Sequence, residues 1–145
     1  MKPIVPIAAL ALALSPLTVL HPLKVSGRSM EPALRSGELA WALWAWCAGT
    51  PRRGQVWMVA GPEGASVKRI VGLPSDRVES KAGELFINGS RLDEPYVERS
   101  DALEGAWECR DGYLLLGDNR RESHDGRAWG ALPRSSLRGR LLGHF

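Results

Sequence analysis

From residue 23 onward, the chain consists of short apolar runs that Gly, Pro and Asp residues interrupt at close intervals. Runs of about four to eight residues between turn-forming residues are typical of strands, whereas helices need longer stretches with helical periodicity. The expected strands cover residues 39–46, 55–60, 66–73, 77–80, 84–88 and 113–116. The Asn88-Gly89 pair adds a hairpin-turn signal. The pattern therefore predicts a mainly β domain, folded as an antiparallel sheet or barrel.

The N-terminal segment differs from the rest of the chain. An uncharged stretch rich in Ala, Leu, Ile and Val runs over residues 3–20, and the next charge is Lys24. A cleaved secretory signal would also place a basic residue before an apolar region, but no clear Ala-x-Ala site with a polar start follows. The stretch is at the short end of what crosses a bilayer. We expect an apolar membrane anchor helix over residues 1–22 and a single domain over residues 23–145.

Charge and metal-binding residue types narrow the possible functions. The net charge is +3, and Lys and Arg residues are scattered among acidic ones, so nucleic-acid binding is not expected. Cys47 and Cys109 form no CxxC pair, although a single disulfide between them stays open. His21, His124 and His144 lack metal-binding spacing. We therefore expect neither a metal nor an organic cofactor.

Three tryptophans, Trp41, Trp44 and Trp46, stand within six residues of the apolar run 39–46. A continuous apolar run is by default a buried core strand. One strand rarely buries so many tryptophans, however, and tryptophan favours membrane interfaces. The run thus has two interpretations, a core strand or a strand whose side chains reach the lipid headgroups.

Ser29 has the surroundings of a nucleophile. It lies between Gly27 and Pro32, which predicts a shaped loop rather than the middle of a strand. A serine of this kind attacks a carbonyl only when a neighbouring base removes its proton. Most serines near glycine simply form turns, so this segment needs support from elsewhere in the chain.

Lys68 lies in the predicted strand 66–73 among apolar residues. Strand alternation places Lys68 on one face of that strand and Arg69 on the other. Burial lowers the pKa of a lysine because water no longer supports its charged form. A neutral lysine can serve as general base, and a Ser–Lys dyad is a variant of the serine-protease scheme. A lysine lying along the surface is the commoner case for a lone Lys.

A dense polar segment, residues 117–130, follows the predicted strand 113–116. It brings hydroxyl, carboxylate, amide and guanidinium groups next to a strand of the core. Such a density of polar side chains indicates a hydrogen-bonded wall of an active site.

Four ordered motifs run through the chain. They consist of Ser29, Met30, Pro32, Leu34 and Gly37; Arg53 and Gly54; Lys68, Arg69, Gly72, Leu73, Pro74 and Asp76; and Gly117, Asp118, Asn119, Ser123, Asp125, Arg127, Trp129 and Gly130, with Asn88, Gly89, Glu94, Pro95 and Tyr96 between the last two. Together they resemble the motif set of bacterial signal peptidase I, a family of serine proteases with a Ser–Lys dyad. The short distance between the last two motifs is similar to compact members that lack a large inserted domain.

The resemblance implies a role for each matching residue. Ser29 would attack the scissile carbonyl, and neutral Lys68 would take its proton. Ser123 would hydrogen-bond the Lys68 amine, and the backbone N–H of Ser29 would contribute to the oxyanion hole. Gly27 stands where some relatives carry a hydroxyl that helps to bind the oxyanion, so this donor is missing. The remaining implied positions are two ion pairs, Arg69 with Asp118 and Asp125 with Arg127, and Met30 close to the substrate-binding groove.

The resemblance also implies an activity and a location. The protein would be a membrane-bound serine endopeptidase that removes signal peptides from exported preproteins after small residues, typically Ala-x-Ala. Its partners would be preprotein signal peptides and membrane lipids, and it would act as a monomer. It would span the cytoplasmic (inner) membrane once, with residues 23–145 as the peptidase catalytic domain on the extracytoplasmic side.

Several alternatives remain open. A maturation peptidase of the conjugation or pilus type would use the same dyad on different substrates. A Ser-His-Asp hydrolase would use Ser29, His124 and either Asp118 or Asp125. A self-cleaving repressor-type peptidase should carry a DNA-binding motif, and the apolar start stands in its place. The non-enzymatic alternative is an inactive β module tethered to the membrane.

Overall fold

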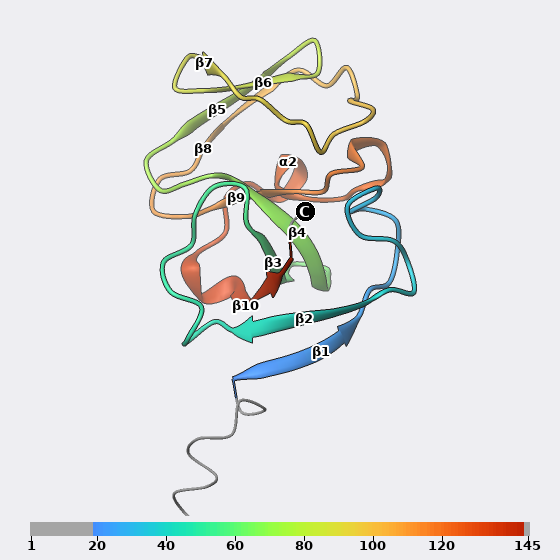
Figure 1. Cartoon of the computed structure of the whole chain (residues 1–145). Coiled ribbons are helices and arrows are strands. Elements are labelled where there is room, and N and C mark those ends of the chain that lie inside the picture. The colour runs from blue at the N-terminus through green and yellow to red at the C-terminus, as the bar shows by residue number, and fades with distance from the viewer. Residues whose placement is uncertain (1–18, 144–145) are drawn as a thin grey trace, which may run out of the picture.

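The computed structural model describes residues 19–143, and most of its regular structure is short antiparallel strands (Figure 1). The strands are β1 (Leu20–Lys24), β2 (Leu39–Trp44), β3 (Val56–Gly61), β4 (Gly64–Gly72), β5 (Arg77–Lys81), β6 (Glu84–Ile87), β7 (Ser90–Arg91), β8 (Gly105–Glu108), β9 (Leu114–Leu116) and β10 (Leu137–Leu142). Three short helical elements follow β9, namely η2 (Arg120–Glu122), α2 (Gly126–Trp129) and η3 (Arg134–Ser136). The predicted mainly β, antiparallel fold is confirmed.

Two sheets make up the domain. The larger sheet has six strands in the order β1-β2-β10-β3-β4-β9, and the smaller one has four in the order β7-β6-β5-β8. In Figure 1 the smaller sheet lies at the top, β1 and β2 lie at the bottom, and β4 runs between them. β10, the last strand of the described residues, lies inside the larger sheet and pairs with β2 on one side and β3 on the other.

All six predicted runs contain a strand, namely β2, β3, β4, β5, β6 and β9. The predicted turn is also present, because Asn88 and Gly89 have φ angles of 51° and 86° and join β6 to β7. The strands β1, β7, β8 and β10 were not predicted. β1 contains Pro22, β7 has two residues, and β10 alternates apolar with polar residues but includes Gly139, so none carries a strong local signal.

The predicted anchor helix falls mostly outside the described residues, which begin at residue 19. Its last part, Leu20–Pro22, lies instead in β1. This part is a strand because β1 pairs along its whole length with β2, from Leu20 opposite Leu43 to Lys24 opposite Leu39. Within residues 19–143, no helix has the length and apolar character needed to cross a membrane.

Three clusters of buried apolar side chains form the core. One includes Met30, Leu34 and Val56 and lies beneath the loop that carries Ser29. A second surrounds the fully buried Trp57. The third combines side chains of β4 and β9 with those of β5 and β6 and with Cys109, which follows β8. It therefore packs the smaller sheet against the larger one. β4 is thereby held in the middle of the domain.

The three tryptophans of the run 39–46 are exposed and do not belong to the core. Trp41, Trp44 and Trp46 are 48%, 39% and 73% exposed, whereas Ala40 and Ala42 are buried. Alternation along β2 turns Ala40 and Ala42 inward and Leu39 and Trp41 outward. The alternation ends before Trp44, the last residue of the strand, and Trp46 lies beyond it. The first interpretation of this run is therefore wrong for its tryptophans.

The two cysteines are free thiols, so the disulfide that the sequence left open is not formed. Cys109 is buried in the third core cluster. Burial raises the pKa of its thiol to about 11, with a smaller contribution from the negative charge of Asp76. Cys109 therefore stays protonated at neutral pH and behaves as a small apolar side chain.

Candidate active site

Ser29 lies on the loop between β1 and β2, and this loop is tied to the polar segment after β9. Gly27 has a φ of 86°, in the left-handed region that favours glycine, and it turns the chain just before Ser29. The backbone N–H of Asn119 donates to the Ser29 carbonyl at 3.0 Å. Met30 anchors the next position in the core and is only 2% exposed. The contact of Met30 with a substrate groove stays a prediction.

Lys68 comes from the middle of β4 and reaches Ser29. Its Nζ lies 2.9 Å from Ser29 Oγ, within hydrogen-bond distance, and the lysine is 3% exposed. Burial lowers its pKa below the usual value of 10.5, because desolvation disfavours the ammonium form. The Asp125 carboxylate opposes this shift, and Arg127 adds a smaller lowering effect. A neutral Lys68 amine could therefore accept the proton of the Ser29 hydroxyl.

Ser123 makes a different hydrogen bond from the one expected. Its Oγ donates to Asp125 Oδ2 at 2.7 Å, and no hydrogen bond joins it to Lys68 in the described part of the chain. A carboxylate is a stronger acceptor than an amine that is itself bonded to Ser29, which explains why Ser123 bonds Asp125 rather than Lys68. Ser123 thus contacts the carboxylate whose charge acts on Lys68.

Asp125 is the centre of a buried hydrogen-bond network. It accepts from Arg127 Nε at 2.8 Å and from the backbone N–H of Gly117 at 2.9 Å, and the predicted Asp125–Arg127 ion pair is present. Burial opposes ionisation of Asp125, but the hydrogen bonds from Arg127, Gly117 and Ser123 outweigh it and lower the pKa of the carboxyl. Asp125 therefore remains a carboxylate, and Arg127 also bonds the carbonyls of Arg120 and Ser123.

The predicted pair of Arg69 and Asp118 is also present, on the other face of β4. Its two hydrogen bonds measure 2.8 Å and 2.6 Å, and the side chains are 2% and 1% exposed. A third guanidinium bond reaches the Gly54 carbonyl at 2.7 Å, and the Tyr96 ring stacks on the guanidinium at 3.9 Å. This pair fastens the segment that carries Asn119 to β4 and thereby to Lys68.

The sequence analysis did not predict two contacts of the site, the close packing at Gly117 and the bonds of Arg120. A Cβ atom at Gly117 would lie 2.2 Å from Ser123 Oγ and 2.6 Å from the Ser29 carbonyl oxygen, so only glycine lets these segments meet. Arg120 is 3% exposed, forms an ion pair with Glu94 and donates to the Gly117 carbonyl at 3.0 Å. The Glu94-Pro95-Tyr96 motif was the only sequence signal for the second feature.

The arrangement does not support a Ser-His-Asp triad. His124 Nε2 lies 3.2 Å from Glu63 Oε1 at the surface, and its side chain is 57% exposed. Asp118 and Asp125 are both bonded to arginines. Among residues 19–143, no group of His, Cys, Asp and Glu side chains is placed to hold a metal ion.

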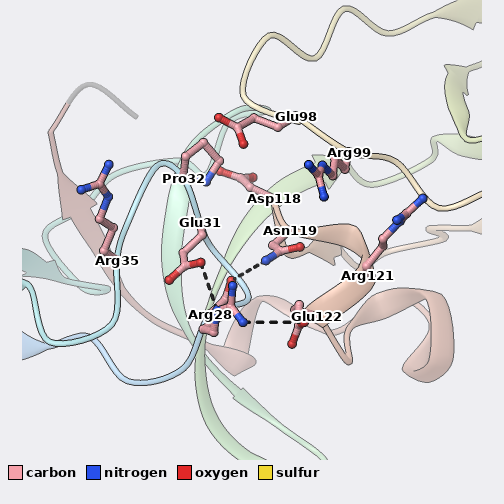
Figure 2. A pocket seen from close by; sticks show the side chains of 10 residues that line it. All are labelled: Arg28, Glu31, Pro32, Arg35, Glu98, Arg99, Asp118, Asn119, Arg121 and Glu122. Atoms are coloured by element: carbon pink, nitrogen blue, oxygen red, sulfur yellow. Dashed lines mark hydrogen bonds and ion pairs between the residues drawn. The ribbon is translucent and has the colours of Figure 1, made fainter.

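A cavity of about 540 Å³ adjoins the Ser29 loop. Three segments form its wall, namely residues 28–35, residues 98–99 and residues 118–122 (Figure 2). Its lining is dominated by arginine and carboxylate side chains rather than by apolar ones.

Comparison with known proteins points in one direction. The model of the family described as "Signal peptidase, peptidase S26" matches residues 1–144. Signal peptidase IB of Staphylococcus aureus is 31% identical over 149 aligned residues, which cover 88% of this chain and 78% of that protein. A probable signal peptidase I-2 of Synechocystis is 45% identical over 83 residues, covering 56% of this chain and 38% of that protein. The crystal structure of a signal peptidase I from Enterococcus faecalis V583 superimposes with a TM-score of 0.55 and 28% identity, covering 64% of this chain and 97% of the other.

Proposed function

This chain belongs to the signal peptidase family, peptidase S26, and is on that ground a serine protease that removes signal peptides. We propose that it is a membrane-bound endopeptidase that cuts exported preproteins after small residues, at sites of the Ala-x-Ala type. The observation that carries this proposal is the 2.9 Å separation of Lys68 Nζ and Ser29 Oγ in a buried setting. A nucleophile and a base at hydrogen-bond distance are what acyl transfer requires.

In the proposed mechanism, neutral Lys68 takes the proton of Ser29 Oγ as this oxygen attacks the scissile carbonyl carbon. The resulting Lys68 ammonium then gives its proton to the leaving amine as the peptide bond breaks, which leaves an ester on Ser29. Neutral Lys68 next takes a proton from water as the water oxygen attacks the ester carbonyl carbon. The bond from that carbon to Ser29 Oγ then breaks, the Lys68 ammonium returns its proton to Oγ, and the acyl group leaves as a carboxylic acid. The backbone N–H of Ser29 stabilises the oxyanion, since Gly27 carries no hydroxyl.

The surrounding polar network supports the dyad in this proposal. Ser123 and Arg127 hold the Asp125 carboxylate in place. Its negative charge raises the pKa of Lys68 and so partly offsets the lowering by burial. Ser123 is thus a positioning residue that acts through Asp125. The Arg69–Asp118 pair keeps the two strands that carry the site in register.

An exposed edge of β4 favours binding of the substrate as an extended strand. β9 pairs with β4 only over residues 69–72, while β3 pairs with residues 64–69 on the other edge. Within the described part of the chain, no strand covers the other edge of β4 over residues 64–68. An extended peptide adding to this edge would pair its backbone with β4 and present its carbonyl near Lys68 and Ser29.

We expect the purified protein to cleave a preprotein after an Ala-x-Ala site. Changing the last Ala of this site to Leu should lower kcat/KM by about 100-fold, because a pocket shaped for a methyl group excludes a larger side chain. Mass spectrometry of the products locates the cut. A substitution at the middle position serves as the matched control and should change the rate little. Equal cleavage of the Leu substrate would contradict the proposed specificity, and cleavage restricted to pilin-like substrates would favour a maturation peptidase.

The exposed apolar side chains of β2 support the proposed contact with lipid. Leu39 is 76% exposed and lies in the same segment as the exposed tryptophans, and Leu142 of the neighbouring β10 is 39% exposed. Indole rings favour the headgroup region of bilayers. The anchor, the single-pass location in the cytoplasmic membrane and the extracytoplasmic position of the catalytic domain stay predictions.

Adding lipid vesicles to the full-length protein is expected to shift its tryptophan emission to shorter wavelengths, because indoles that enter the headgroup region lose water. The shift should shrink strongly in a Trp41→Phe/Trp46→Phe variant. A Trp57→Phe variant is the control, since Trp57 is fully buried and cannot meet lipid. An unchanged emission spectrum in the wild-type protein would count against contact of this surface with the bilayer.

A further inference from the structure

The charge-lined cavity beside Ser29 takes no part in the proton transfers described above. Figure 2 shows Arg28 at its centre, with dashed lines to Glu31, Glu122 and Asn119. Arg28 Nε lies 3.2 Å from Glu31 Oε2, and its Nη1 lies 3.9 Å from Glu122 Oε1. This group of one guanidinium and two carboxylates has one negative charge in excess.

The other arginines of the cavity have no such partner. Arg35, Arg99 and Arg121 are exposed, and none of them forms an ion pair with any residue of the described range 19–143. Glu98 is the one carboxylate of the lining that is likewise unpaired in that range, because Asp118 is bonded to Arg69. The three unpaired guanidinium groups still outnumber Glu98 and the excess carboxylate of the Arg28 group, so the lining has a small positive excess. Guanidinium groups bind carboxylates well, which favours an anionic ligand.

The cavity is held at a fixed position relative to the nucleophile. The Asn119 backbone N–H donates to the Ser29 carbonyl, and Asn119 Nδ2 donates to the Arg28 carbonyl at 3.2 Å. The wall formed by residues 118–122 therefore moves together with the Ser29 loop. A group bound in the cavity would lie within a few residues of a peptide bond under attack at Ser29.

The position of β4 indicates which part of a substrate would reach the cavity. The uncovered edge of β4 ends at Lys68, so it accommodates the residues before the cut. The chain after the cut then continues past Ser29, where Arg28 and Glu31, on either side of the nucleophile, line the cavity. We propose that this cavity binds the first residues of the mature protein and selects for Asp or Glu side chains among them. This inference rests on the proposed function and names a specificity site for it.

The test compares three preproteins with the same Ala-x-Ala site and Glu, Gln or Lys within the first few residues after the cut. We expect wild-type kcat/KM to be about 5- to 10-fold higher for Glu than for Lys at low ionic strength, with a smaller ratio at high salt. An Arg99→Glu/Arg121→Glu variant should lose or reverse this preference. An Arg52→Glu/Arg138→Glu variant changes the net charge equally at exposed sites outside the cavity lining and should keep it.

The Gln substrate separates this inference from the proposed function. If the wild-type protein cleaves it but shows the same kcat/KM for Glu and Lys, the cavity has no such role while the protease assignment stands. If both double variants lose the preference equally, only the overall charge matters and the inference is wrong. If no preprotein is cleaved by the wild-type protein, both proposals fall together.

Discussion

Replacing Lys68 with alanine is expected to lower kcat/KM for preprotein cleavage by about 10⁴-fold or more, and Ser29→Ala should do the same. The proposed base, Lys68 Nζ, lies 2.9 Å from Ser29 Oγ, and no other basic group lies within hydrogen-bond distance of that oxygen among the described residues. Residues that act as one unit are strongly non-additive, so the double variant should be no slower than either single variant. Initial rates measured with one preprotein and varied enzyme concentration give all three values.

The dependence of the rate on pH identifies the role of Lys68. The amine serves as base only when neutral, so kcat/KM should rise as the pH increases through the pKa of Lys68. Because burial lowers this pKa, the rise should lie below 10.5, the usual value for a lysine. A Lys68→Arg variant should be inactive across the whole range, since a guanidinium group stays protonated.

Lys81→Ala is the matched control for these variants, because Lys81 is exposed on β5 and pairs only weakly with Glu79. It should retain the wild-type rate and pH profile. Turnover that survives in Lys68→Ala, or a profile that falls as pH rises from neutral, would rule out Lys68 as the base.

Replacing Arg69 with methionine is expected to lower the free energy of unfolding by about 3–5 kcal/mol, because the change leaves the Asp118 carboxylate buried without its partner. The pair is almost fully buried, and Arg69 also bonds the Gly54 carbonyl and supports the Tyr96 ring. Urea unfolding followed by circular dichroism measures the change.

The pH dependence of this loss has a definite sign. Burial raises the pKa of Asp118 even beside Arg69, and removing the guanidinium would raise it further. The variant should therefore lose less stability at acidic pH, where the carboxyl is protonated, and more as the pH rises to neutral. Arg91→Met removes an exposed pair with Glu84 and is the control, with a much smaller effect. An equal loss in both variants would show that the buried pair does not stabilise the domain.

Local patterns in the sequence were enough to predict many of the strands and turns of this domain. The runs containing β2, β3, β4 and β9 are mostly apolar between turn residues, and those containing β5 and β6 flank the short segment 81–83. The Asn88-Gly89 turn depends only on its own two residues. Alternation along β4 separated Lys68 from Arg69, a feature that follows from a short stretch of sequence. The pairs of Arg69 with Asp118 and of Asp125 with Arg127 were implied by the resemblance to signal peptidase I, and both are present.

Other features depend on residues that are distant in the sequence. β10 is a strand because it pairs with β2 on one side and β3 on the other, and Trp41 faces outward because its neighbours Ala40 and Ala42 face the core. The hydroxyl of Ser123 was predicted to bond Lys68, but it donates to the Asp125 carboxylate at 2.7 Å, which is the stronger acceptor.

The separation of Lys68 and Ser29 is the clearest case of this division. The sequence by itself determined that Ser29 lies on a shaped loop and Lys68 in an apolar strand, and the resemblance of its motifs assigned the two to one site. Only the tertiary structure decided that they meet at 2.9 Å with the lysine out of water, since this requires the Ser29 loop, β4 and the segment after β9 to pack together. Desolvation and contact are properties of packing, and no stretch of sequence has them alone.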